Sequence, residues 1–543
     1  MVGSSETAES RAQLLSRVDG VTWAIAIAAG IAPLWLAGML PLVDLPQHLH
    51  LISVLHRLHD PTTLYPRLFE ARGELTPYLG YYHVVSLLHW LLPLEIANKI
   101  FLSAYVAGMP LGMAFLLRSL DRPTWPALLA IPFAYGDSFA WGFINYCSAL
   151  PLTFVAAGCF ARAVADPPRR RRWAALLAVT LVAALLFHVQ AFAYLGVALP
   201  FLLLTTRAPE DAAPPAPGDS LIDRCIRPRL LALIAVVPGV ALFAAWFGGR
   251  LGKPVEIAPG EPWKAWGPIF SPQNLAWKSK PQNWEELPQV LANMLRDGSD
   301  RYALYAVALV ALAGAATAAA SRLARHRPPS SRGPVERWRI LGLALIALGL
   351  YFFLPFDVRG YVYYLNTRYA HLAAPLLLAS VPIVHGRAAR PLLFAAAATS
   401  LLVAVPLSSA FNAFSREAAP LRRLSSATGE RPMVMGLIFD PSSRVMRHPV
   451  FLHSAAVIAT ARGGATNFSF ASTPHSPLRY RGDPPPTFPS EWNPRAFSMG
   501  AHGYAYDHFL VRGAHPSRVF SEPLPADLYL AGEGGGFFLL RRR

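Results

Sequence analysis

Long hydrophobic blocks recur along this chain, and short polar or arginine-rich connections separate them. The blocks run for roughly 16 to 24 residues, which is enough for an α-helix to cross a bilayer core of about 30 Å. The pattern therefore predicts an α-helical polytopic membrane protein with about eleven transmembrane helices, at 21–40, 96–117, 124–137, 142–162, 173–189, 191–206, 230–247, 302–320, 339–355, 369–385 and 391–411.

The arginines concentrate in connections that this map places on one side of the membrane, at 118–122, 166–172, 207–229, 321–339 and 386–390. Because cytoplasmic loops carry an excess of Lys and Arg, these connections are predicted to face the cytoplasm. Residues 1–20 then form a cytoplasmic N-terminus, and 21–411 form a transmembrane domain with outer loops at 41–95 and 248–301.

One apolar block, residues 78–93, does not fit as a further crossing. A crossing there would move the four consecutive arginines at 169–172 to the outer side, against the charge rule. The Tyr, His and Trp content of the block is typical of the headgroup level of a membrane. We therefore expect a helix that lies in or dips into the outer interface.

The region 412–543 differs in character, because Pro, Gly, Ser, His and Arg become frequent and long apolar runs stop. Short apolar runs at 432–440, 506–513 and 535–543 predict strands, and 448–464 predicts a helix between the first two strands. This region is therefore predicted to be a small extracytoplasmic α/β domain.

Composition supports the membrane class and limits the partners. Of 543 residues 54% are hydrophobic and 15% are charged, and the formal net charge is +17. In a soluble protein this charge would indicate nucleic acid, but here much of it lies in short loops, where it marks topology, so no nucleic-acid partner is expected. Cys147, Cys159 and Cys225 lie in or beside apolar blocks without metal-ligand spacing, so no disulfide framework is implied.

The stretch "VDLPQHL" holds the first candidate for chemistry. Asp44 follows the first predicted helix at the depth of a lipid phosphate, where a carboxylate can act as a general base or hold a divalent cation. The alternative is a helix-capping aspartate ahead of an apolar run. The nearby histidines 48, 50, 56 and 59 do not share one helical face, so solvated interfacial histidines are favoured over a zinc site.

Two short stretches inside the apolar region hold further polar candidates. Arg368, beside Tyr369 in "LNTRYA", lies at the predicted outer end of a helix and is the best cation for a phosphate, with interfacial snorkelling as the alternative. His188 and Gln190 stand at a helix break in "LLFHVQAFAY". Polar groups at membrane depth usually face a cavity, which favours substrate binding over a hydrogen bond between helices.

An Asp just after the first transmembrane helix, an amphipathic outer loop, a second Asp after a later helix and about eleven crossings together resemble the C-type (GT-C) superfamily of glycosyltransferases, which use polyprenyl-phosphate sugars. The stretches "VDLPQHL", "WGFINY" and "LNTRYAHLAAPLLLA" are similar to stretches in bacterial members. The resemblance implies that Asp44 is the catalytic or metal-holding carboxylate and that Asp137 is the second acidic position. Many members have a paired acidic motif where this chain has a single Asp, so His48 is the expected helper; Trp141 and Asn145 are expected to bind substrate.

The resemblance implies a hexosyl- or pentosyltransferase in the bacterial inner (cytoplasmic) membrane, with the C-terminal domain in the periplasm. It would move a sugar from a polyprenyl-phosphate donor, among membrane lipids, to a glycan, lipid or protein acceptor on the outer face. A divalent cation, Mg²⁺ or Mn²⁺, is the one cofactor left open. The alternatives are a secondary transporter or flippase of a lipid-linked substrate, or a non-catalytic scaffold with the same fold. The polar residues gather at one surface and no repeat is visible, which favours chemistry over transport.

Overall fold

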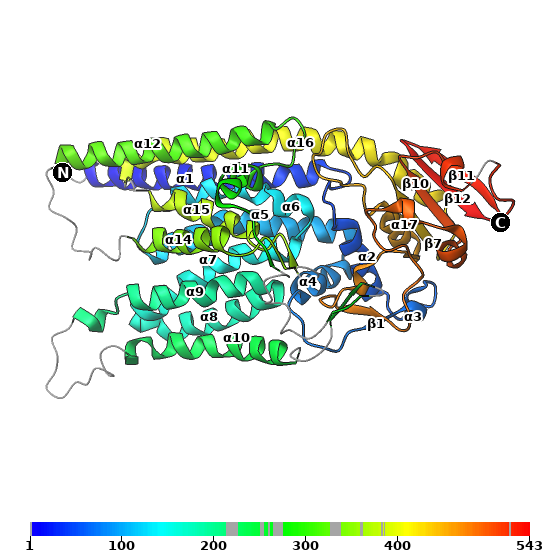
Figure 1. Ribbon diagram of the computed structural model, residues 1–543. Helices are drawn as coiled ribbons and strands as arrows, with labels where there is room; N and C mark the ends of the chain where they lie inside the picture. Colours follow the sequence, from blue (N-terminus) through cyan, green and yellow to red (C-terminus); the bar gives the residue numbers. More distant parts are fainter. Residues whose placement is uncertain are drawn as a thin grey trace.

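Helices run side by side along the long axis of the molecule, and a β-sheet near the C-terminus lies at one end (Figure 1). The computed structural model describes residues 3–212, 226–249, 255–258, 261–263, 275–325, 338–358, 362–381, 384, 386–520 and 523–543. The predicted outer loop 248–301 lies partly outside the described residues.

Within these ranges, ten of the eleven predicted crossing segments are α-helices: α1 (Gly3–Leu36), α5 (Leu94–Ser119), α7 (Ile144–Ala165), α8 (Arg170–Phe187), α9 (Val189–Thr205), α10 (Leu230–Gly248), α12 (Tyr302–Arg325), α14 (Arg339–Phe353), α15 (Ala370–Ser380) and α16 (Arg390–Ala427). Seven described helices are long and apolar enough to cross a membrane by length and composition, and two apolar helices are shorter. The chain is therefore a multi-pass membrane protein, and the count of about eleven crossings stays a prediction.

The segment predicted as a helix at 124–137 has a different form. It consists of two 3₁₀ helices, η1 (Trp125–Ala130) and η2 (Pro132–Tyr135). Pro132, in the middle of the segment, lacks the N–H that a continuous α-helix needs there, and a 3₁₀ helix rises about 2.0 Å per residue instead of 1.5 Å. A short segment can therefore cover more depth in the bundle than an α-helix of equal length.

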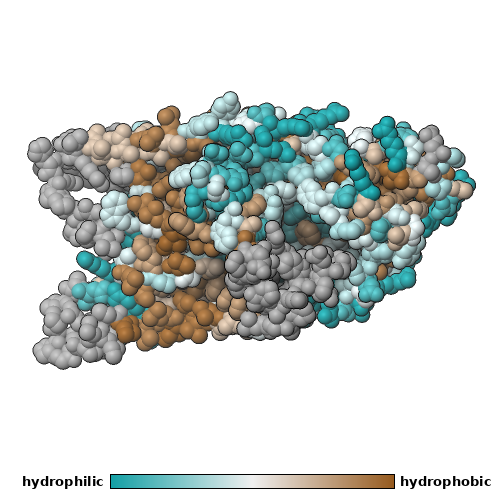
Figure 2. All heavy atoms as spheres, viewed as in Figure 1, coloured by the Kyte–Doolittle hydropathy of each residue, from teal (hydrophilic) through white to brown (hydrophobic). Residues whose placement is uncertain are grey.

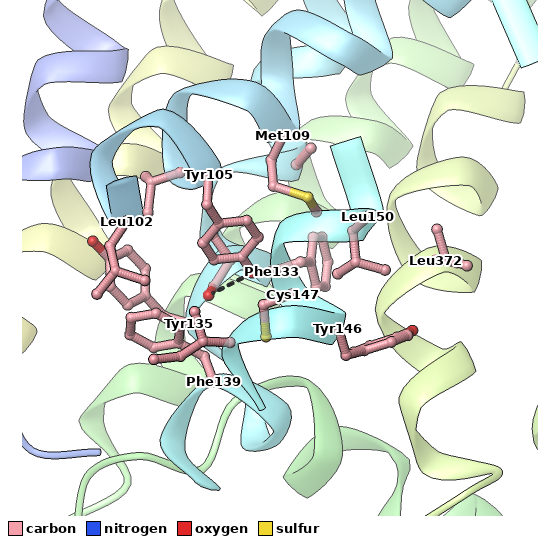
Figure 3. Close-up of a cluster of buried hydrophobic side chains, with 14 of the residues drawn as sticks. Leu102, Tyr105, Met109, Phe133, Tyr135, Phe139, Tyr146, Cys147, Leu150 and Leu372 are labelled. Atoms are coloured by element: carbon pink, nitrogen blue, oxygen red, sulfur yellow. Dashed lines mark hydrogen bonds between the residues drawn. The ribbon is translucent and has the colours of Figure 1, made fainter. Parts of the chain in front are cut away.

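These 3₁₀ turns pack against α5, α15 and α16, and Phe133 and Tyr135 lie in the apolar core that supports the site (Figure 3). The hydroxyl of Tyr105, on α5, donates to the backbone oxygen of Ala134 at 2.9 Å, and Tyr135 donates to the oxygen of Gly30 at 2.6 Å. Both buried phenols thus have a backbone oxygen as hydrogen-bond acceptor. The segment leading to Asp137 is held by these contacts.

The first outer loop contains two helices, α2 (Leu45–His56) and α4 (Leu79–His89). With 11 residues, α4 is about 16 Å long, too short to cross a core of about 30 Å. It exposes apolar side chains, including Leu87 and, just after its end, Trp90 and Leu91. This form fits the predicted interfacial helix, and its place in a membrane stays a prediction.

The C-terminal region forms a five-stranded mixed sheet in the order β11-β12-β10-β7-β8. The three predicted strands are present as β7 (Met433–Ile438), β10 (His508–Arg512) and β12 (Phe537–Arg542), joined by β8 (Ala465–Thr466) and β11 (Leu528–Gly534). The strand β10 runs parallel to β7, with Leu510 opposite Gly436, and antiparallel to β12. The predicted helix 448–464 is shorter, since α17 spans Ser454–Arg462 and the residues before it form turns.

This C-terminal region is not detached from the helices. The helix α17 packs on α2 and α16, and β1 (Phe69–Ala71) of the first outer loop pairs antiparallel with β9 (Leu478–Tyr480). In Figure 2 the exposed hydrophobic residues gather over the helices away from the sheet, and the surface toward the sheet is mainly hydrophilic. The candidate site lies where these two parts meet.

Candidate functional site

A cavity of about 670 Å³ lies between the helices and the C-terminal region. Six of the nine residues predicted for the site line it: Asp44, His48, Trp141, Asn145, His188 and Arg368. The other three do not line it: Gln190 accepts from Arg368, Tyr369 donates to the backbone oxygen of Gln190, and Asp137 contacts His448. Residues far apart in the sequence thus converge on one cavity.

Asp44 occupies the N-cap position of α2, but its side chain makes no capping hydrogen bond. Its carboxylate Oδ1 instead lies 3.4 Å from Nε2 of His453. Asp44 therefore stands at an N-cap position, as the capping alternative predicts, but its side chain does not cap the helix. The carboxylate lines the cavity with a histidine behind it.

His453 stands between two carboxylates at the start of α17. Its Nδ1 lies 3.4 Å from Oε2 of Glu491, on the side opposite Asp44. Burial on its own lowers the pKa of His453, but Glu491 and Asp44 together outweigh burial, so the pKa rises above its ordinary value of 6.5. Burial also raises the pKa of Glu491. A protonated His453 places a positive charge behind the carboxylate of Asp44.

The backbone of Asp44 is held by the turn that ends α6 (Asp137–Trp141). Its N–H donates to the carbonyl oxygen of Trp141 at 3.0 Å. Gly142 follows with a φ of +87°, and a Cβ there would lie 2.9 Å from the Asp44 nitrogen. Only glycine allows both this backbone conformation and this approach without strain. Gly142 in "WGFINY" therefore positions Asp44.

Asp137 makes a second carboxylate–histidine pair, with Oδ1 2.7 Å from Nε2 of His448. The indole of Trp141 stands edge-on to the His448 ring, at 5.4 Å between centroids. Asp137 is thus beside the cavity and one residue removed from its lining. Its carboxylate is engaged with the C-terminal region, as that of Asp44 is.

His48, predicted as a helper of Asp44, has both ring nitrogens engaged. Nε2 lies 3.1 Å from the oxygen of Gly142, so Nε2 carries the proton, and Nδ1 accepts from the Tyr82 hydroxyl at 2.7 Å. Burial lowers the pKa of His48 to about 4, so the ring is neutral near neutral pH. Its contacts make His48 a residue that holds α2 against Gly142. His50, expected to be solvated, is fully buried and contacts the oxygen of Gly464.

Arg368 enters the cavity from η10 (Thr367–Tyr369) and is 9% exposed. Its Nη1 donates to Oε1 of Gln190 at 2.7 Å and lies 3.1 Å from Nε2 of His188, and its guanidinium lies 4.2 Å from the centroid of the Phe143 ring. Its Nε is buried without a hydrogen-bond partner, and no described carboxylate lies within ion-pair distance of the guanidinium. Gln190 therefore orients Arg368 and does not itself face the cavity.

The divalent cation implied by the resemblance can be tested against the donor set. Asp44 is the one carboxylate among the described residues of the cavity lining. In the described part of the chain, no group of three or more His, Cys, Asp and Glu side chains gathers as a ligand set. Mg²⁺ and Mn²⁺ require several oxygen ligands, so the residues around Asp44 do not fit a cation held by protein side chains alone.

The two histidines that face the acidic residues were missed in the sequence. His448 and His453 begin and end "HPVFLH", five residues apart, in a stretch predicted only as a helix. Glu491 and Trp492, in the Pro-rich loop, also reach the site. The one available signal was the pair of histidines in the polar C-terminal region, and it does not indicate which acids they face.

No protein-family model matches the chain, and no curated protein matches it. Among solved structures it is similar to ArnT from Cupriavidus metallidurans bound to undecaprenyl phosphate, at 11% identity and a TM-score of 0.43, over 98% of both chains. It is also similar to the arabinofuranosyltransferase AftD from Mycobacteria, at 14% identity and a TM-score of 0.48, over 96% of this chain and 40% of AftD.

A third match is the oligosaccharyltransferase of Archaeoglobus fulgidus, at 12% identity and a TM-score of 0.42, over 90% of this chain and 68% of that one. By their names AftD and the Archaeoglobus protein are glycosyltransferases, the class of protein that the sequence resemblance indicates. At such identities and TM-scores the likeness does not by itself decide a shared function.

Proposed function

We propose that this protein is a membrane glycosyltransferase that moves a sugar from a polyprenyl-phosphate donor to an acceptor hydroxyl. The observation that carries the proposal is Arg368, a buried cation without a carboxylate partner among the described residues, in the same cavity as the carboxylate of Asp44. The proposed reaction needs these two groups, because one charge meets a phosphate and the other accepts a proton.

The surroundings of Arg368 favour an anionic ligand. A buried charge is costly unless it is paired, and the guanidinium offers more N–H donors than its neighbours can accept. Arginine presents its donors in a planar fork that matches phosphate oxygens. The phosphate of a lipid-linked sugar supplies both the missing negative charge and the missing acceptors.

Asp44 is suited to activate the acceptor. In the proposed step its carboxylate takes the proton of the acceptor hydroxyl while the new bond to the anomeric carbon forms. The bond between that carbon and the phosphate oxygen breaks, and the polyprenyl phosphate leaves with its charge facing Arg368. The aromatic rings of Trp141, Tyr364 and Trp492 line the cavity and offer faces for the sugar ring.

The cavity lies at the end of the bundle that faces the sheet, where the outer loop 41–95 is predicted. We therefore infer that transfer takes place on the outer face of the inner membrane, with the C-terminal region in the periplasm. The sugar is a hexose or a pentose in this proposal, and the acceptor is a glycan, lipid or protein.

The test is transfer of radiolabelled sugar from a panel of polyprenyl-phosphate donors by purified protein in lipid. We expect Asp44→Asn and Asp44→Ala to lose at least about a hundredfold in rate, the lower range for loss of a general base. Asp483→Asn, an exposed aspartate outside the cavity, serves as the matched control. Transfer that survives both Asp44 changes rules out the base, and passage of a lipid-linked sugar across the bilayer without transfer would replace the proposal by a transporter.

A further inference from the structure

A second cavity, larger and more polar than the first, lies where α16 meets the sheet (Figure 1). Its volume is about 860 Å³, and we call it the arginine groove. Five arginines and two carboxylates line it: Arg296, Arg416, Arg444, Arg512, Arg518, Glu417 and Asp440. None of these residues lines the cavity of Asp44 and Arg368.

The two carboxylates of the arginine groove are already engaged by the loop after β7. Glu417 accepts from the hydroxyl of Ser443 at 2.7 Å and from the backbone N–H of Arg444 at 3.1 Å. Asp440 accepts from the hydroxyl of Ser442 at 2.6 Å and lies 3.6 Å from Nη1 of Arg512. Arg512 is therefore the structural arginine of the groove, fixed by the carboxylates and by backbone oxygens.

The side chains of Arg416 and Arg444 differ from that of Arg512. Both are exposed, both line the arginine groove, and neither lies within ion-pair distance of a carboxylate in the described part of the chain. Two guanidinium groups that share one hollow repel each other unless an anion lies between them. The groove therefore has unpaired positive charge with the fork geometry that suits phosphate oxygens.

The arginine groove also extends toward the membrane. A smaller cavity of about 260 Å³ shares Arg296 and Arg444 with it and reaches Pro406, Ser409 and Ala410 on α16. These three residues end the segment predicted to cross the membrane, so the arginines stand at headgroup depth beside an apolar helix. This placement favours an anion that is attached to a lipid.

We propose that the arginine groove binds a phosphate-bearing lipid headgroup at the outer membrane surface, at a site separate from the cavity of Asp44. The loop after β7 connects the two, because Ser442–Val445 line the groove and His448, three residues further on, contacts Asp137. A headgroup bound by Arg444 therefore holds the loop that places His448. This site does not depend on the proposed reaction.

The experiment measures binding of short-chain lipids to the purified full-length protein in a non-ionic detergent. The probes are dihexanoyl phosphatidylglycerol, the zwitterionic dihexanoyl phosphatidylcholine and inorganic phosphate. We expect phosphatidylglycerol to bind more tightly than phosphatidylcholine, and Arg416→Gln/Arg444→Gln to weaken its binding by at least about tenfold, as expected for the loss of charge-assisted bonds. The control is Arg423→Gln/Arg495→Gln, which removes two exposed arginines outside the groove and should leave the Kd within about twofold.

Equal binding of the two lipids by the wild type, or equal losses in the two double variants, overturns the proposal. Competition between inorganic phosphate and phosphatidylglycerol that is seen in the wild type and not in Arg416→Gln/Arg444→Gln supports the phosphate site. If inorganic phosphate binds as tightly as the lipid, the site belongs to a soluble anion. Asp44→Asn should keep wild-type lipid binding, which separates this proposal from that of the reaction. Melting temperatures of both double variants show whether the fold is intact.

Discussion

Replacing Arg368 distinguishes two roles for this cation, which are binding a ligand and stabilising the fold. Arg368→Gln removes the charge from a side chain that is 9% exposed and has no described carboxylate partner. A structural ion pair would lose stability on this change. A cation held in place to bind an anionic ligand should instead lose binding while the fold remains stable.

The magnitudes follow from the contacts of Arg368. Hydrogen bonds to charged groups contribute about 1.5 to 3 kcal/mol, so losing about 3 kcal/mol toward a phosphate weakens donor binding about 150-fold. On the stability side, loss of the bonds to Gln190 and to the backbone oxygen of Tyr363 costs about 1 to 3 kcal/mol. Removing a buried unpaired charge offsets this by a similar amount, so Tm should stay within about 2 °C.

The assay combines Kd for a polyprenyl phosphate, the KM of the donor and Tm in the same detergent. Arg368→Lys keeps a charge without the planar fork and should fall between wild type and Arg368→Gln in affinity. Arg495→Gln, an exposed arginine outside the cavity, is the matched control. Wild-type affinity in Arg368→Gln would refute the phosphate contact, and a loss of more than about 10 °C in Tm would show that Arg368 is structural.

Three further changes probe the two carboxylate–histidine pairs. The facing carboxylates raise the pKa of His453 above the 6.5 of an unfolded chain. Their attraction to the protonated ring therefore stabilises the fold fully below about pH 6.5, and this stabilisation is lost as pH rises through the folded pKa. In the wild type Tm should fall over this pH range, and in His453→Gln this fall in Tm should be absent. Gly142→Ala should lower transfer by at least about tenfold, because the new Cβ meets the backbone of Asp44, and unchanged kcat would contradict this positioning. Asp137→Asn should lower transfer less than Asp44→Asn in parallel rate measurements, since Asp137 faces His448 beside the cavity; equal losses would place both acids in the reaction.

The helices were predictable because a bilayer imposes one simple rule on the sequence. A segment that crosses about 30 Å of hydrocarbon must be long and apolar, and this property is visible without any knowledge of neighbours. The segment 124–137 shows where the rule ends, since Pro132 interrupts the expected α-helix and the segment forms 3₁₀ turns. Strands such as β7 and β10 were predictable for a related reason, because they are short apolar runs bounded by turn residues.

The candidate site was predictable only on the side of the transmembrane domain. Asp44, His188 and Arg368 stand out because each is a polar group in or next to an apolar block, and all three line the cavity. His453 and Glu491 have no such contrast, because they lie in a polar region where such residues are common. Their positions depend on how α17 packs against α2, which is a long-range contact that local pattern does not contain.

The charges on the two sides of the cavity indicate where the donor and the acceptor bind in the proposed reaction. The negative charge of Asp44 is met from behind by His453, so its free oxygen can face a neutral hydroxyl without a second cation. The positive charge of Arg368 has no such counterpart among the described residues, so an anion belongs in front of it. A donor would then place its phosphate at Arg368 and an acceptor its hydroxyl at Asp44, with the anomeric carbon between them. A direct ion pair between Asp44 and Arg368 would leave neither charge available for substrate. The two side chains have separate environments, and these keep the charges from pairing with each other.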